Sequence, residues 1–365
     1  MNNEEIYWLA FSTVRGIGAV RFRKLLDFFG ELSRAWTADK VELITAGLTE
    51  KAANQVLEAR STLDLNRIEP DLDKKGIEYL TWNSPAYPKY LQEISQPPPV
   101  LYFKGTITPA DDIAIAIVGT RNVTKYGKQI TKDTAAYLAG NGITVVSGLA
   151  RGVDGIAHKA ALEAGGRTLA VLGSGVDVIY PPEHRQLANE IIKNGAIISD
   201  YPPGTKPDGI NFPARNRIIS GLTSGTVVIE AGERSGALIT AKFALEQGRD
   251  IYAVPGSVLS QLSKGTNQLI AEGAMPMTNP AIITEAMNLK SETVKPKRDR
   301  IVLTSNEANI LRVLGNESLH IDEICAKTSM GIEKLTADLT MMELKGIIER
   351  DKGMEYHRIQ NWDIG

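Results

Sequence analysis

Cysteine is almost absent from this chain of 365 residues, which has a single thiol at Cys325. A lone cysteine cannot form an intramolecular disulfide or a cysteine-based zinc cluster, and such sparse use is typical of a reducing compartment. The chain also lacks an apolar run of the roughly 18 residues that a membrane-spanning helix needs. Near its start, Glu4 and Glu5 stand where a signal peptide would carry positive charge. We therefore expect a cytoplasmic protein that does not bind a membrane.

Several motifs that are typical of enzymes are missing as well. No Gly-x-Gly-x-x-Gly follows the first expected strand and no Gly-x-x-x-x-Gly-Lys-Ser/Thr occurs, so the sequence indicates neither a dinucleotide-binding site nor a P-loop ATPase. Ser147, Ser174 and Ser235 lie outside any Gly-x-Ser-x-Gly turn, so no serine nucleophile is indicated. The histidines form no metal-ligand motif with carboxylates: His158, His184, His320 and His357. We predict no catalysis, no cofactor and no metal.

Neither sign of charge dominates the chain. Its 41 Lys and Arg residues against 43 Asp and Glu residues give a net charge of −2, within an ordinary globular composition. Residues 301–365 hold 7 basic against 11 acidic residues, a net of −4, which leaves +2 for residues 1–300. A nucleic-acid site is therefore expected within the first 300 residues.

Residues 1–69 predict a small all-α domain, because apolar residues recur there at helical spacing. Gly16 and Gly18 flank one apolar residue between two helical patterns, which is the hairpin of a helix-hairpin-helix (SAM-like) unit. Residues 46–50, before a helix at 51–60, form a weaker second copy. Such turns offer backbone N–H groups to a phosphate in some proteins and only pack in others, and the sequence leaves both roles open.

A connector and then a repeated strand–turn–helix pattern follow. Three consecutive prolines exclude a helix late in the connector, residues 70–112, where we expect one or two strands around 77–80 and 100–103. Beyond it, short and nearly all-apolar runs alternate with Gly-rich turns and amphipathic stretches, as in a parallel sheet buried on both faces. The pattern predicts an α/β fold with an extended Rossmann-like, doubly wound parallel sheet, in a domain of residues 70–288. Its expected strands are 113–118, 143–146, 168–172, 196–198, 226–229 and 250–254, with helices that include 128–139, 153–164 and 237–247.

A linker separates the last part of the chain. Residues 289–300 are charged, aperiodic and contain a proline. Three helical patterns then precede an expected hairpin of residues 347–350 and 354–358, with the helices at 307–314, 321–327 and 332–344. This order predicts a winged-helix domain over residues 301–365.

Glycine-rich turns follow several expected strands of the central domain, at 118–121, 147–154 and 173–175. In an open parallel sheet such turns gather at the carboxyl edge of the strands, near the topological switch point. Glycines let a ligand approach the backbone, and the helix N-termini behind them present unpaired N–H groups, a combination that selects phosphates. The same edge is expected to receive residues 211–217, 230–238 and 264–267.

Phe212 and several basic residues make this edge a candidate site for single-stranded nucleic acid. An aromatic ring beside an amide and near Arg215 suits a site that pairs base stacking with phosphate contacts. Phe212 is equally compatible with a core position, and Arg215 and Arg217 with helix capping. Binding is favoured by the expected convergence of four basic residues, Arg121, Arg151, Arg215 and Lys242.

The motifs occur in a fixed order at residues 87–88, 98–102, 118–121, 147–158, 173–177, 180–181, 212–217, 235–241 and 265–267. In this order they closely resemble the bacterial DNA-processing protein A (DprA/Smf) family, and the flanking domains resemble the family's optional ends. The resemblance implies an extended Rossmann domain that binds and protects single-stranded DNA. It also implies a homodimer through that domain, which helps to load RecA onto incoming strands during natural transformation and recombination. It implies binding and not catalysis.

The same resemblance assigns roles to individual residues. Arg121 resembles the arginine that grips a phosphate, Phe212 the aromatic that stacks on a base, and Lys242 a further contact to the backbone of the strand. Gly209 stands where a lysine would strengthen the pocket. The predicted DNA-binding residues are Thr120, Arg121, Ser147, Gly148, Arg151, Gly152, Gly173, Ser174, Gly175, Phe212, Arg215, Asn216, Lys242, Thr266 and Asn267. Apolar residues of the last α/β unit are candidates for the dimer contact or, alternatively, for the core: Ile251, Val254, Leu269, Ile270, Met275 and Met277.

Two other functions fit less well. The same Rossmann variant resembles nucleotide hydrolases of the LOG (lysine decarboxylase-like) type, which cleave a nucleoside monophosphate with a catalytic glutamate late in the domain. This chain has Ile239 or Thr240 at that position, and Asp154 and Glu230 are the only carboxylates at the edge that could act as acid or base. A double-stranded DNA repressor would act through the winged helix, whose recognition segment carries more acids than bases.

Overall fold

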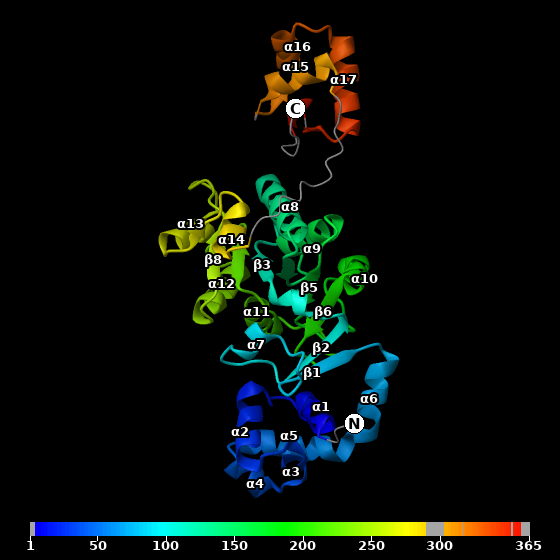
Figure 1. Ribbon diagram of the computed structural model, residues 1–365, viewed down its shortest axis with the longest axis vertical. Coiled ribbons are helices and arrows are strands. Elements are labelled where there is room, and N and C mark those ends of the chain that lie inside the picture. Colours follow the sequence, from blue (N-terminus) through cyan, green and yellow to red (C-terminus); the bar gives the residue numbers. More distant parts are fainter. Residues whose placement is uncertain (1–3, 290–302, 316, 352, 359–365) are drawn as a thin grey trace. The chain divides into compact units, whose positions relative to one another are not determined.

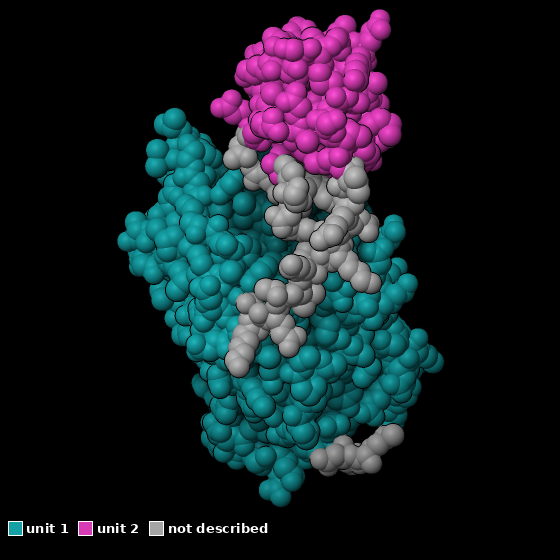
Figure 2. Space-filling view, turned by 45° about the horizontal axis from the view of Figure 1, so that its top comes forward, with its two compact units in different colours: residues 1–294 teal, residues 295–365 magenta. Residues whose placement is uncertain are grey.

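The computed structural model describes residues 4–289, 303–315, 317–351 and 353–358 (Figure 1). It divides the chain into two compact units, residues 1–294 and residues 295–365 (Figure 2). Residues 290–300 of the predicted linker lie outside the described residues, and the boundary expected at residue 69 stays a prediction. Within the described ranges, no helix is both long enough and apolar enough to cross a membrane.

The N-terminal helices of the first unit pack around aromatic side chains. The rings of Phe11 and Trp36 meet edge to face with their centroids 5.0 Å apart, and Trp8 lies 5.7 Å from Phe22. Gly16, at φ +84°, turns the chain between the first two helices as the hairpin motif predicts. The helices are α1 (Glu5–Thr13), α2 (Ala19–Phe29), α3 (Leu32–Thr37), α4 (Lys40–Thr45), α5 (Glu50–Thr62) and α6 (Leu65–Lys74).

These helices share a core with the sheet that follows. Trp8 of α1 packs edge-on against Trp82 at 5.6 Å, and the hydroxyls of Ser12 and Tyr102 are hydrogen-bonded at 2.6 Å. One cluster of buried side chains contains residues of the helices and alternate residues of the nearest strands. The helical segment and the α/β segment are therefore parts of one compact unit.

A nine-stranded sheet forms the centre of the first unit, in the order β1-β2-β6-β5-β4-β3-β7-β8-β9. Neighbouring strands in the part of this order from β6 to β9 pair in parallel. Of the two connector strands, β2 pairs antiparallel with β6, and β1 pairs antiparallel with β2. The predicted α/β fold and both connector strands are confirmed. The strand order reverses between β3 and β7, which is the switch point where ligands of such sheets bind. The strands are β1 (Glu78–Thr81), β2 (Val100–Gly105), β3 (Ala114–Val118), β4 (Thr144–Ser147), β5 (Thr168–Val171), β6 (Gly195–Ser199), β7 (Gly225–Val228), β8 (Asp250–Ala253) and β9 (Met275–Pro276).

Helices cover both faces of the sheet, as alternate residues of β3 show. Ile115 and Ile117 pack with α8 and α9 on one face, whereas Ala116 and Val118 point to the other face, where α11 and α12 lie (Figure 1). The helices are α7 (Lys89–Gln92), α8 (Lys125–Gly140), α9 (Val153–Glu163), α10 (Arg185–Lys193), α11 (Asn211–Gly221), α12 (Gly236–Glu246), α13 (Lys264–Ala271) and α14 (Ala281–Ala286), with 3-10 turns η1 (Pro109–Asp112) and η2 (Pro182–His184).

Residues 211–217, for which the sequence indicated no helix, are the first two turns of α11. Pro213 is the third residue of this helix, where a backbone N–H would have no partner within the helix in any case. The proline is therefore compatible with a helix that begins at Asn211.

The second unit has the predicted winged-helix order. Thr304 and Glu307 form a reciprocal capping box at the start of its first helix, and Leu335 and Leu339 of its last helix are fully buried. A short strand pairs with the C-terminal hairpin in the order β10-β12-β11. The elements are α15 (Ser305–Leu314), β10 (Leu319–His320), α16 (Ile321–Thr328), α17 (Ile332–Leu344), β11 (Ile348–Arg350) and β12 (Glu355–Arg358).

Candidate functional site

The turns after β3 and β4 pack directly against each other. Gly152, at φ +75°, lies under the backbone of the first turn, where a Cβ would collide with the carbonyl groups of Thr120 and Arg121. The Val153 N–H donates to the Thr120 carbonyl at 3.2 Å. Glycine is therefore required at residue 152, and Arg121 stands on a backbone that the second turn supports.

Several backbone N–H groups of these turns are bonded inside the protein. Those of Gly148 and Ala150 donate to the Asp154 carboxylate at 3.1 and 3.3 Å, and that of Thr120 donates to the Glu230 carbonyl at 2.7 Å. Ser147 is buried and donates to the Ile117 carbonyl at 2.6 Å. The expectation of N–H groups left unpaired for a phosphate is therefore wrong for Gly148, Ala150 and Thr120.

Arg215 is buried rather than exposed at the sheet edge. Its side chain is 4% exposed, and its Nη1 donates to the Gly148 carbonyl at 2.8 Å and to the Val171 carbonyl. Burial lowers the pKa of Arg215 to about 10, while the neighbouring Asp154 carboxylate opposes that shift. Neither a phosphate contact nor helix capping describes this arginine in the structure, because its hydrogen bonds go to a turn carbonyl and to a strand-end carbonyl.

An aromatic surface lies next to these turns. The ring of Phe212 rests against Gly173, where a Cβ would come within 2.9 Å of it. The guanidinium carbon of Arg121 lies 5.9 Å from the centroid of the Phe212 ring, and the ring of Tyr180 lies 5.6 Å from the same ring. Asn211 donates its side-chain amide to the Gly173 carbonyl at 3.1 Å, which fixes the helix start on this turn. Three flat groups, Arg121, Phe212 and Tyr180, thus form one surface.

Sequence reasoning missed Tyr180 as a site residue. Its side chain is 38% exposed and it follows the glycine turn 173–175 by a few residues. An aromatic residue placed soon after a ligand-binding turn was the available signal, but the sequence could not show that its ring meets that of Phe212.

A groove of about 700 Å³ opens beside Arg121, between the first turns of α8 and α9 and the start of α10. It is lined by basic residues, Lys128 and Lys159 among them, and by the acidic Glu183 and Glu190. The Arg151 guanidinium is paired with the Glu183 carboxylate at 2.5 Å, which raises the pKa of Arg151 and lowers that of Glu183. Arg151 is therefore at the predicted edge, but its charge is paired with a carboxylate of the same chain.

The third turn is held by its own contacts. Ser174 is buried and donates to the Val178 carbonyl at 2.7 Å, and the Gly175 N–H donates to the Thr205 carbonyl at 3.0 Å. These residues shape the turn that carries Gly173.

Four predicted residues have contacts away from the aromatic surface. Asn216 donates to the Gly236 carbonyl at 3.3 Å and thereby joins α11 to α12. Thr266 is buried, the Asn267 amide bonds both backbone groups of Gly256, and Lys242 is exposed with Glu246 at 3.9 Å. The contacts of these residues do not join them to the aromatic surface.

The two candidate acid–base carboxylates have structural partners. Glu230 is buried and accepts from the N–H and the hydroxyl of Thr124 at 2.9 and 2.5 Å, which fixes the start of α8. Asp154 holds the turn after β4, and burial raises its pKa while Arg215 lowers it. Among the residues that the structure describes, no group of three His, Cys, Asp or Glu side chains is placed to hold a metal ion.

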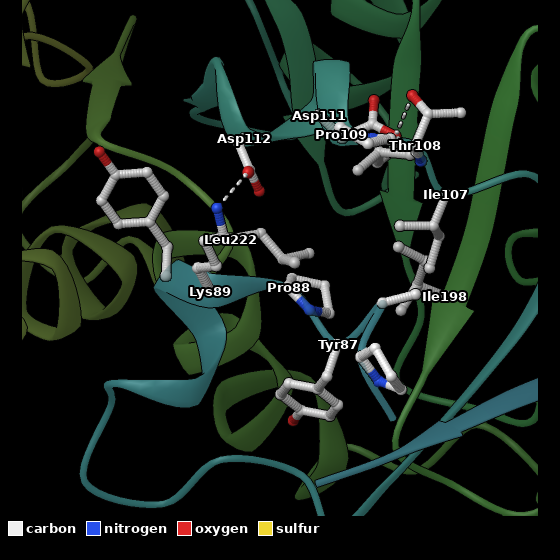
Figure 3. A pocket seen from close by; sticks show the side chains of 14 residues that line it. Tyr87, Pro88, Lys89, Ile107, Thr108, Pro109, Asp111, Asp112, Ile198 and Leu222 are labelled. Atoms are coloured by element: carbon white, nitrogen blue, oxygen red, sulfur yellow. Dashed lines mark hydrogen bonds and ion pairs between the residues drawn. The ribbon is translucent and has the colours of Figure 1, made fainter. Parts of the chain in front are cut away.

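The Tyr87-Pro88 motif lies elsewhere, at a separate pocket of about 160 Å³ (Figure 3). Tyr87 donates to the Pro98 carbonyl at 2.7 Å, and burial raises its pKa. Among the lining residues, Lys89 lies 3.8 Å from Asp112 (Figure 3). This motif fixes the connector against the sheet and contributes nothing to the aromatic surface.

Comparison with known proteins gives consistent matches. Residues 78–288 match the family model of DNA recombination-mediator protein A, and residues 294–354 match that of the DprA winged helix domain. Protein Smf from Synechocystis is 36% identical over 98% of this chain and 99% of its own. The DNA processing protein DprA of Bacillus subtilis is 39% identical over 70% of this chain and 89% of its own.

Two solved structures are similar as well. The X-ray structure of DNA processing protein A from Streptococcus pneumoniae superimposes with a TM-score of 0.69 at 35% identity, over 78% of this chain and 98% of that one. A structure that describes the single-stranded DNA binding mode of DNA processing protein A from Helicobacter pylori matches with a TM-score of 0.52 at 33% identity, over 58% of this chain and 96% of that one.

Proposed function

Because this chain belongs to the DNA recombination-mediator protein A (DprA/Smf) family, we propose that it binds single-stranded DNA at the carboxyl edge of its central sheet. The observation that carries the proposal is the surface of Arg121, Phe212 and Tyr180, with ring centroids 5.6 Å apart and the guanidinium 5.9 Å from the Phe212 ring. Flat aromatic faces stack on any base, and an arginine beside them can contact the phosphate backbone of the strand. The protein acts by binding and not by catalysis.

The arrangement favours single strands over duplex. Phe212 is half-buried, with Gly173 beneath its ring and Tyr180 beside it, so only a base that has left its own stack can reach the ring. A duplex would have to unpair and unstack a base at a cost of a few kcal/mol. The proposed readers are aromatic faces and phosphate contacts, so binding is expected to be independent of sequence.

A salt series with fluorescent oligonucleotides tests the proposal. We expect oligo-dT to bind much more tightly than a duplex of the same length, with an affinity that falls steeply as salt rises. Removing one phosphate contact by Arg121→Ala reduces the slope of log affinity against log salt by about 0.7. Lys193→Ala makes the same charge change at the amino end of β6, and it is the matched control that keeps the slope. Equal affinity for single strand and duplex would refute the proposal.

We further propose that the protein acts as a homodimer and passes its strand to RecA. The last unit of the sheet supports this: β9 is a two-residue edge strand, and Met275 on it is 43% exposed, whereas Val254 and Met277 are buried in the core. Two copies joined at this edge present two surfaces to one strand, which raises the effective concentration without new contacts. RecA would then meet the same edge or one close to it.

A further inference from the structure

Helix α11 holds two of the loops that form the candidate site. Its Asn211 amide and Phe212 ring contact Gly173 in the turn after β5, and one turn later Arg215 donates to the Gly148 carbonyl in the turn after β4. Arg215 also donates to the Val171 carbonyl at the end of β5. A single helix start therefore fixes both turns relative to each other.

Arg215 fills its position closely. A Cβ on Gly148 would lie 2.5–2.7 Å from Nη1, Nη2 and Cζ of the Arg215 guanidinium, so this flat group lies directly on the glycine. Below it, Asp154 accepts the N–H groups of Gly148 and Ala150. The turn is thus held through its Gly148 carbonyl by Arg215 and through two of its N–H groups by Asp154.

The cost of this arrangement suggests a role other than stability. The Nε of Arg215 is buried and has no hydrogen-bond partner among the described residues, and burial lowers the pKa of Arg215 and raises that of Asp154. Removing a charged group from water costs free energy, which is recovered only when the buried group is fully hydrogen-bonded. An incompletely bonded buried arginine is therefore better explained by the geometry that it imposes.

We infer that Arg215 and Asp154 are positioning residues that set the binding-competent form of the 148–152 turn, and through it the place of Arg121. This inference rests on the proposed single-strand binding. Arg215 and Asp154 hold Gly148 at the start of the turn. The turn ends at Gly152, which supports the backbone of Arg121. The Arg121 guanidinium in turn lies over the ring of Phe212, which belongs to α11, the helix that carries Arg215. When the turn is free to move, the fraction of molecules with Arg121 in place falls, and the apparent affinity falls in proportion.

The test compares charge-conserving and charge-removing variants of two arginines in the full chain. Lysine keeps a positive charge but lacks the planar fork that reaches two carbonyl groups. We therefore expect Arg215→Lys to lose about tenfold or more in affinity for oligo-dT, as Arg215→Ala does, because hydrogen bonds to charged groups contribute on that scale. Neither variant changes the salt slope. Arg121→Lys keeps the salt slope, because it keeps the charge that contacts the phosphate, whereas Arg121→Ala loses affinity and about 0.7 of the slope.

Gly148→Ala gives an independent perturbation, because its methyl group meets the guanidinium without altering any charge. It is expected to weaken oligo-dT binding as Arg215→Lys does and to keep the salt slope. Hydrogen exchange of the amides of residues 148–152, measured without DNA, should be accelerated in both variants and unchanged in Arg121→Ala. Circular dichroism confirms that each variant is folded.

The inference is overturned if Arg215→Lys binds like the wild type, or if Arg215→Ala loses slope as Arg121→Ala does, since Arg215 would then be a phosphate ligand. Unchanged exchange at residues 148–152 in Arg215→Lys also overturns it. A wild-type protein that binds no single strand refutes the proposed function, and the exchange measurement still decides whether Arg215 positions the turn.

Discussion

Phe212→Ala removes the central member of the aromatic surface and leaves all charges in place. Stacking one base on an aromatic side chain contributes about 1–3 kcal/mol, so the variant should bind oligo-dT roughly 5- to 150-fold more weakly. The upper part of this range is favoured, because Phe212 also contacts Arg121 at 5.9 Å and Tyr180 at 5.6 Å, and both lose a neighbour. The salt slope should not change, since no phosphate contact is removed.

The assay is fluorescence anisotropy with two oligonucleotides, oligo-dT and the same strand with abasic sites. The wild type should bind the abasic strand more weakly than oligo-dT, and Phe212→Ala should hardly distinguish the two, because the base has lost its ring. Phe212→Trp retains a stacking face and serves as the matched control, with affinity near the wild type. The reasoning fails if Phe212→Ala binds oligo-dT normally, or if it loses as much affinity for the abasic strand as for oligo-dT.

Four further outcomes are expected. Glu183→Gln should tighten oligo-dT binding, because it releases Arg151 from its 2.5 Å ion pair, and weaker binding would exclude Glu183 as a competitor of DNA. Deletion of residues 301–365, with their net charge of −4, should leave oligo-dT affinity nearly unchanged, and a large loss would place DNA contacts in the winged helix. Met275→Glu should shift sedimentation of the full chain from dimer to monomer, and a wild type that is monomeric at micromolar concentration removes the support for the two-surface model. Burial lowers the pKa of His158 to about 3. Between about pH 6.5 and pH 3 the unfolded chain therefore binds a proton at this residue that the folded chain does not bind. The free energy of unfolding should fall by about 1 kcal/mol from pH 6 to pH 5, and His158→Gln should abolish this part of the fall.

The sheet was predictable because its strands are buried on both faces. Runs such as residues 113–118 are apolar without interruption, and only a covered parallel sheet accommodates them. The second connector strand begins directly after three prolines, which exclude a helix at residues 97–99. The start of α11 was not predictable in this way, because Asn211, Phe212 and Pro213 give no apolar period, and what holds them is contact with the turn at Gly173.

The site was predictable in position and not in detail. Glycine turns after parallel strands indicate where a ligand binds, and Arg121 and Phe212 are indeed brought to one surface. Burial of Arg215 could not be predicted, because the sequence motif gives the position of an arginine along the chain and not its exposure to solvent. The same holds for the N–H groups of the turns, which Asp154 takes up through contacts that depend on the folded backbone.

Photocrosslinking is the most direct test of where the single strand binds. Oligo-dT with 5-iodouracil in place of some thymines reacts with an aromatic side chain that stacks on the base, and mass spectrometry of the digested complex locates the adduct. The account predicts adducts at Phe212 or Tyr180 in the wild type and the loss of the Phe212 adduct in Phe212→Ala. Adducts confined to residues 4–69 or to residues 303–358, with none at the two rings, would contradict it.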